Sequence, residues 1–182
     1  MSVSEDAITR TQAWIEHAVV GLNLCPFAKA PMVKGQIRYV LSETEDPRLL
    51  LALLCDEMRT LVAADPVRIE TTLVIHPNVL NDFEDFNDFL GAADAALADL
   101  GCEGVLQIAS FHPQYRFEGT EADDVGNATN RAPYPTLHLL REASVDRAVE
   151  AFPESEAIYE SNVRTLEALG ADGWRALSAR WS

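Results

Sequence analysis

The chain has 182 residues and carries 14 Lys and Arg against 29 Asp and Glu, a net charge of −15. Nonspecific nucleic-acid binding depends on basic side chains that neutralise phosphates, so this balance argues against nucleic acid as a partner. No apolar run is long enough to span a bilayer, and the N-terminal residues lack the pattern of a signal peptide. We therefore expect a single globular domain, residues 1–182, in the cytoplasm, with no membrane or nucleic-acid partner.

The apolar residues recur with helical and strand periods in turn. Asp46 and Pro47 are typical of a helix start, and Asn81 with Glu84 resembles a capping pair. The predicted helices cover residues 5–22, 47–64, 82–100, a short stretch from 144, and 155–180 with a break near 170–173. The predicted strands cover residues 36–42, 67–76, 104–112 and 135–141, and residues 23–35 are expected to be irregular. This order favours an α/β (or α+β) fold, in which a single layer of about four mostly parallel strands is flanked by helices and both termini are helical.

Two of the predicted strands end in the same dipeptide, His76-Pro77 and His112-Pro113. If these strands are parallel, both imidazoles lie at the carboxyl edge of the sheet, where open α/β sheets bind ligands. Histidine exchanges protons near neutral pH and is the commonest metal ligand. The alternative is that each histidine only caps the end of its strand through a hydrogen bond.

A loop of about twenty residues follows the second His-Pro pair, and long loops inside compact domains are often functional. Asp123 and Asp124 are adjacent, so only one of them is expected to face a site. Arg131 is suited to bidentate contact with a carboxylate or phosphate. The alternative is a surface loop that uses Asp and Asn for turns. The other polar candidates in this region are Asn127, Asn130 and Tyr134.

The direction of the fourth strand decides which of its residues reach the His-Pro edge. If it runs antiparallel to the third strand, it begins at that edge, and His138 can approach His112. If it runs parallel, Arg141 reaches the edge instead. A buried, hydrogen-bonded His138 is the structural alternative.

Three cysteines, Cys25, Cys55 and Cys102, are widely spaced and form no CxxC pair, so we expect all three to be reduced. Cys25 follows the end of the first predicted helix, a position that raises the pKa of a thiol rather than activating it. Burial is therefore the favoured role of Cys25, although we keep it among the residues that could contact a substrate.

Three blocks, GLNLCPFA at 21–28, QIASFHPQYRF at 107–117 and TNRAPYPTLHLLRE at 129–142, resemble the bacterial family catalogued as domain of unknown function number 1415. The resemblance covers nearly the whole chain and implies a single bacterial cytoplasmic domain. It implies no activity and no catalytic residue.

Three hypotheses for function follow. The first is an enzyme acting on a small anionic substrate, with His112 as general acid/base, Asp124 as its partner or a second base, and Asn130 stabilising developing charge. Its substrate would be held by Arg131, Asn127, Tyr134, Arg141 and Cys25.

The second hypothesis is a metal site built from His76, His112 and Asp124, with His138 as a further candidate ligand, a mixture that suits Zn, Fe or Mn. The third is a non-catalytic binding or scaffold domain, in which Arg131 pairs with Asp123 or Asp124. We find no GxGxxG, Walker A or GxSxG motif, so the sequence points to no particular cofactor.

Overall fold

The computed structural model describes residues 3–152, 154 and 157–182. Within these residues one sheet forms, with the strands in the order β1-β2-β4-β3. The strands are β1 (Ile37–Leu41), β2 (Thr71–Ile75), β3 (Leu106–Phe111) and β4 (Thr136–Arg141). β1 and β2 are parallel, whereas β4 runs antiparallel to both β2 and β3. The first three strands therefore point the same way, as predicted, but β4 lies between β2 and β3.

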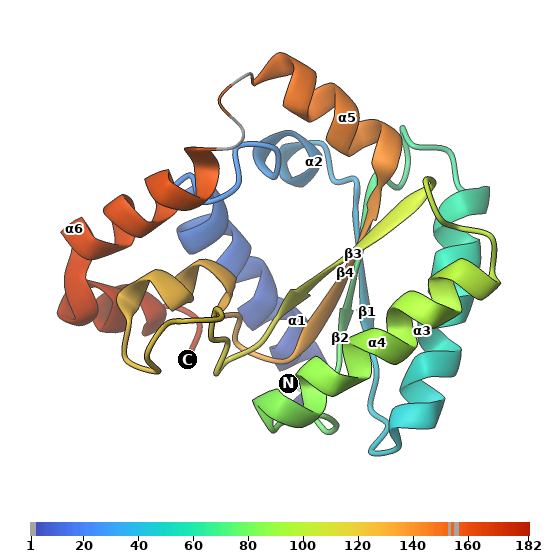
Figure 1. Ribbon diagram of the computed structural model, residues 1–182, viewed down its shortest axis with the longest axis horizontal. Coiled ribbons are helices and arrows are strands. Elements are labelled where there is room, and N and C mark those ends of the chain that lie inside the picture. Colours follow the sequence, from blue (N-terminus) through green and yellow to red (C-terminus); the bar gives the residue numbers. More distant parts are fainter. Residues whose placement is uncertain (1–2, 153, 155–156) are drawn as a thin grey trace.

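Helices cover both faces of the sheet and give a three-layer α/β arrangement (Figure 1). One face carries α3 (Pro47–Ala63) and α4 (Phe83–Asp99), and the other carries α1 (Val3–Trp14), which continues as the π-helix η1 (Ile15–Val20). The remaining helices are α2 (Lys29–Val33), the 3₁₀ helix η2 (Val125–Asn130), α5 (Glu142–Ala151) and α6 (Ile158–Ser178). None of the described helices is long and apolar enough to cross a bilayer.

An apolar layer packs on each face of the sheet, and successive residues of a strand point to opposite layers. On the face covered by α3 and α4, Val74 and Leu137 belong to the same buried cluster as Phe86 of α4. On the opposite face, Leu73 packs with Trp14 and Trp181. β2 is buried along its whole length because both its edges are paired and both its faces are covered.

Several local predictions are confirmed, whereas the cap of α4 and two stretches expected to be irregular differ from the prediction. The Asp46 side chain caps α3 by accepting from the Arg48 N–H, with Pro47 as the first helical residue. At α4 the cap is Asp82 rather than Asn81, because the Asp82 carboxylate accepts hydrogen bonds from the backbone N–H groups of Glu84 and Asp85. α6 is broken where predicted, and the residue with non-helical backbone is Gly170, with φ +72°. Short helices α2 and η2 occupy stretches that were expected to be irregular.

Arg141 lies at the end of the sheet opposite His112, since it pairs with Leu106 at the start of β3. Its Nη2 donates to the carbonyls of Leu61, Ala64 and Ile69 at 2.8–2.9 Å. The last carbonyls of a helix have no partner within the helix. Arg141 therefore caps the C-terminal end of α3 and fixes the chain that leads to β2.

Replacing this guanidinium should cost stability, because three carbonyls lose their donor. We expect Arg141→Met, which keeps an apolar stem, to lower the free energy of unfolding by about 2–3 kcal/mol in urea denaturation. The control is Arg147→Met, because the Arg147 side chain is 65% exposed in a surface ion pair, and a change below about 0.5 kcal/mol is expected there. Equal effects of the two substitutions would contradict this role for Arg141.

Candidate functional site

His76 and His112 follow β2 and β3 at the same edge of the sheet, as the sequence predicted. Both side chains face α4 and are 0% exposed. The Phe86 ring lies against both imidazoles, with ring centroids 5.8 Å from His76 and 5.0 Å from His112. The two histidines are therefore buried neighbours under the N-terminal end of α4.

Three of their four ring nitrogens are engaged with backbone groups, and the fourth, His76 Nε2, is buried without a hydrogen-bond partner among the described residues. His76 Nδ1 lies 2.9 Å from the Val79 carbonyl, and His112 Nε2 lies 3.1 Å from the Leu80 carbonyl. A carbonyl only accepts, so each of these nitrogens carries the proton. His112 Nδ1 in turn accepts from the Gln114 N–H at 3.0 Å. The two imidazoles thus hold successive carbonyls of one turn, in which Leu80 adopts a φ of +60°.

The backbone N–H groups of the same two histidines hold the other side of the site. His112 N donates to the Asn130 carbonyl at 3.1 Å, and His76 N donates to the Pro135 carbonyl at 3.0 Å. These bonds bracket residues 131–134. The two strand ends therefore fix that segment at both of its ends.

Burial sets the protonation of these imidazoles. It lowers the pKa of His76 to about 4. Burial also lowers the pKa of His112, against smaller opposing effects of the Leu80 carbonyl and the Asp82 carboxylate. Both rings are neutral at pH 7. Proton transfer by His112 to a ligand requires one of its two backbone hydrogen bonds to open first.

His138 lies on the opposite face of the sheet and does not approach His112. It pairs with Leu73 and Ala109 in the ladder, and its Nε2 lies 2.6 Å from the Thr71 hydroxyl. Burial lowers the pKa of His138 to about 4. In the part of the chain that the structure describes, no three His, Cys, Asp or Glu side chains gather as a group that could hold a metal ion.

Three polar residues of the loop are used to fold it. The buried Asn127 side chain accepts from the Phe117 N–H and the Thr120 hydroxyl and donates to the Glu121 carbonyl. The exposed Asp124 carboxylate accepts from the Glu121 N–H. The Asn130 amide donates to the Ser110 carbonyl. These contacts assign Asn127, Asn130 and Asp124 to the conformation of the loop in this state of the molecule.

Arg131 stands apart from these residues. Its Nε donates to the Tyr115 carbonyl at 3.1 Å and its Nη2 to the Ala122 carbonyl at 2.7 Å. The side chain is half-buried, and this burial lowers its pKa. Among the described residues no carboxylate lies within 4.0 Å of the guanidinium, so neither Asp123 nor Asp124 pairs with it.

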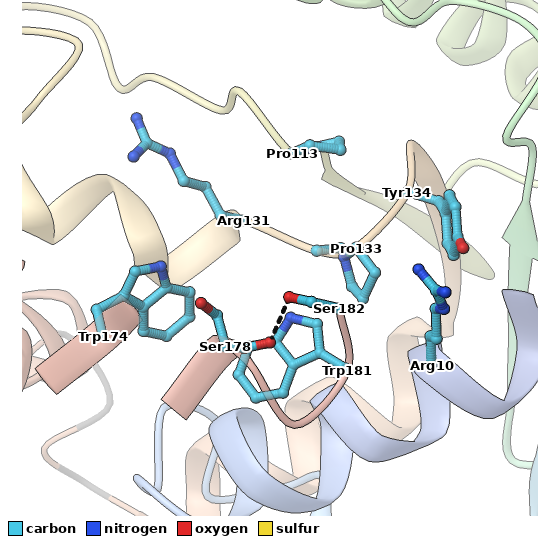
Figure 2. A pocket seen from close by; sticks show the side chains of 10 residues that line it. Arg10, Pro113, Arg131, Pro133, Tyr134, Trp174, Ser178, Trp181 and Ser182 are labelled. Carbon is cyan, nitrogen blue, oxygen red and sulfur yellow. Dashed lines mark hydrogen bonds between the residues drawn. The ribbon is translucent and has the colours of Figure 1, made fainter. Parts of the chain in front are cut away.

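Two hollows share Arg131 and Pro113 as a common wall. The first has a volume of about 300 Å³ and is shown in Figure 2. It is lined by Arg10, Pro113, Arg131, Ala132, Pro133, Tyr134, Trp174, Ser178, Trp181 and Ser182. The second, of about 450 Å³, extends over the start of α4 and is lined by Asp82, Phe83, Glu84, Pro113, Gln114, Arg116, Ala122 and Arg131. We refer to them as the tryptophan hollow and the α4 hollow.

The two hollows differ in charge. The α4 hollow balances Arg116 and Arg131 against Asp82 and Glu84. The tryptophan hollow is lined by two arginines and by no Asp or Glu of the described residues. In a chain of net charge −15 this is a local reversal of sign.

Of the predicted site residues, Arg131 and Tyr134 line the tryptophan hollow, whereas Arg10, Trp174 and Trp181 line it without having been predicted. From the sequence alone, the spacing of the tryptophans indicates only helix packing, and Arg10 lies within a helical pattern. Cys25 and Arg141 line neither hollow. Cys25, Cys55 and Cys102 are free thiols, and burial raises the pKa of Cys25.

Comparison with known proteins identifies the family of the chain. The family model described as "Protein of unknown function (DUF1415)" matches residues 6–176. No curated protein and no solved structure matches the chain.

The buried neutral His76 should make stability depend on pH. The unfolded imidazole takes up a proton below its ordinary pKa of 6.5, whereas the folded one does so only near 4. Stability should therefore fall as the pH drops from about 6.5 to about 4, by about 3 kcal/mol from His76 alone. His76→Asn keeps an N–H donor for the Val79 carbonyl without this titration, so its stability should fall less in urea denaturation over that range.

The control for this measurement is His17→Asn, because His17 lies on η1, away from the sheet edge. It should retain the pH dependence of the original chain. A pH dependence unchanged by His76→Asn would show that His76 is not held neutral in the folded protein.

Proposed function

We propose, for a chain that belongs to the DUF1415 family over residues 6–176, that its function is to bind a small anion, a carboxylate or a phosphate, at Arg131. The observation that carries this proposal is a half-buried guanidinium with no carboxylate partner among the described residues. Removing a charge from water is costly unless it is paired. An anionic ligand would supply the missing partner.

The hydrogen bonds of Arg131 leave room for such a ligand. Its Nε and Nη2 each donate to a carbonyl, which fixes the plane of the guanidinium. Its Nη1 has no hydrogen-bond partner in the described part of the chain. A fixed planar donor group suits the geometry of carboxylates and phosphates.

The surroundings of Arg131 support the same ligand class. The segment that carries it is anchored at both ends by the backbones of His76 and His112, so the charge is held in place before any ligand arrives. Such preorganisation lowers the cost of binding. Among the described residues the wall of the tryptophan hollow contains no Asp or Glu, so no acidic side chain of the wall opposes an anion there.

We place binding ahead of catalysis. Both ring nitrogens of His112 are engaged with backbone groups, and Asp124 and Asn130 are used within the loop. The enzyme hypothesis would therefore require the Gln114 N–H to leave His112 Nδ1 on ligand binding. Pro113 and Gln114 both line the α4 hollow, so such a movement would change the shape of that hollow.

Arg131→Gln removes the charge but keeps an amide donor for one of the loop carbonyls. Thermal unfolding of the original chain should shift upward with inorganic phosphate or acetate. A ligand at about ten times its Kd stabilises the fold by about 1.4 kcal/mol, or roughly 3–5 °C for a chain of this size. Arg131→Gln should abolish this shift while itself costing about 1 kcal/mol through the lost backbone contact.

Arg116→Gln is the matched control, because Arg116 belongs to the same loop, is exposed and lines only the α4 hollow. It should retain at least part of the ligand-induced shift. The proposal fails if no anion stabilises the original chain, or if the shift survives in Arg131→Gln.

A further inference from the structure

The residues that line the tryptophan hollow indicate the shape of the anionic ligand as well as its charge. We infer that it takes an aromatic anion, with the carboxylate or phosphate at Arg131 and the ring against the two tryptophans. This inference rests on the proposed function, since Arg131 supplies the charge. Four observations support it: the aromatic side chains in the wall of the hollow, the unpartnered indole N–H groups, the position of the arginines and the volume of the hollow.

The walls are planar. Trp174 at the end of α6 and Trp181 just beyond it lie with ring centroids 5.8 Å apart and ring planes at 64° to one another. In Figure 2 Pro133 and Tyr134 lie across from Trp181 on the same hollow. Edge-to-face and offset-stacked contacts with such walls favour an aromatic ring over an aliphatic group of similar size.

Both indole N–H groups lack a partner among residues 3–152, 154 and 157–182. Trp14 also has an unpartnered indole nitrogen, but that atom is sealed inside the core. Those of Trp174 and Trp181 are not among the sealed atoms. Figure 2 shows the indole nitrogen of Trp174 on the side of Arg131, where it can donate to an anionic oxygen.

The positions of the two arginines determine how the ligand is oriented in the hollow. Arg10, at the other end of the hollow in Figure 2, already pairs with Asp6 at 2.9 Å. Arg131 is therefore the uncompensated cation of this hollow. The anionic group belongs at Arg131 beside Trp174, and the uncharged ring belongs toward Trp181 and Tyr134.

The size limits the ligand to about one ring. A hollow of about 300 Å³ is at the small end of the range for ligand sites. Of the hydroxyls in the wall, those of Ser178 and Ser182 already donate to backbone carbonyls, and that of Tyr134 interacts with the Arg10 guanidinium. An aromatic carboxylate or aromatic phosphate ester fits this combination of walls, donors and charge.

The test uses pairs of probes that differ only in the ring. The full chain is titrated calorimetrically with benzoate and with cyclohexanecarboxylate, and separately with phenyl phosphate and with inorganic phosphate. We expect the aromatic member of each pair to bind about tenfold more tightly. Trp174→Leu should reduce this preference to about twofold or less, and it should weaken inorganic phosphate no more than Trp174→Phe does, because both variants lose the same indole N–H.

Trp174→Phe is the second variant, because it keeps a ring for packing but lacks the indole N–H. It should weaken benzoate by a few-fold, roughly the effect of one lost hydrogen bond. Equal affinities for benzoate and cyclohexanecarboxylate, or a ring preference that survives Trp174→Leu, would overturn the inference and leave anion binding at Arg131 standing. If none of the four probes binds, both the aromatic-ligand inference and the proposed anion binding at Arg131 are wrong.

Discussion

β4 pairs antiparallel with β2 on one side and β3 on the other, and the site depends on this pairing. The chain leaves β3 at the carboxyl edge and must enter β4 at the same edge, so the intervening loop has to fold back over it. The backbone N–H of His76 extends the β2–β4 ladder by one bond to the Pro135 carbonyl, whereas that of His112 donates to the Asn130 carbonyl at the end of η2. Their imidazoles meanwhile hold the turn that leads into α4. The His-Pro ends thus join the sheet, the loop and α4 in one hydrogen-bonded edge.

The loop that results keeps the half-buried Arg131 guanidinium without a carboxylate partner among the described residues. Asn127 and Asn130 satisfy backbone groups, and η2 packs against α6, whose last turns bring Trp174 beside Arg131. In so acidic a chain, a half-buried arginine would find a carboxylate easily if stability alone were at stake. Its contacts are instead two carbonyls, which orient the guanidinium without neutralising it. We attribute this arrangement to ligand binding, since it leaves charge and donors directed at a concave surface.

The sequence predicted the α/β fold and the shared edge of the two His-Pro pairs, but not the contacts of each candidate residue. Strand and helix periods gave the elements, and the shared His-Pro ends gave the edge. The position of β4 could not be predicted, because a period of two is the same in parallel and antiparallel pairs. For the same reason the sequence could not predict whether Arg141 or His138 reaches the His-Pro edge. In the structure Arg141 caps α3 at the far end of the sheet, and His138 lies on the face that carries α1. The sequence alone does not assign Trp174 and Trp181 to a hollow, since their place in it depends on how α6 lies over the loop.

The central claim is that the Arg131 guanidinium is free to bind an anion. The most direct measurement follows the Nε–Hε signal of Arg131 by nitrogen-15 NMR, assigned through its absence in Arg131→Gln, while inorganic phosphate and then benzoate are added. We expect this signal to shift and saturate with each anion, while the Nε–Hε signal of Arg38, which is already paired with Glu57 at 2.8 Å, stays in place. An Arg131 signal that does not move, or that moves no more than that of Arg38, would contradict the account.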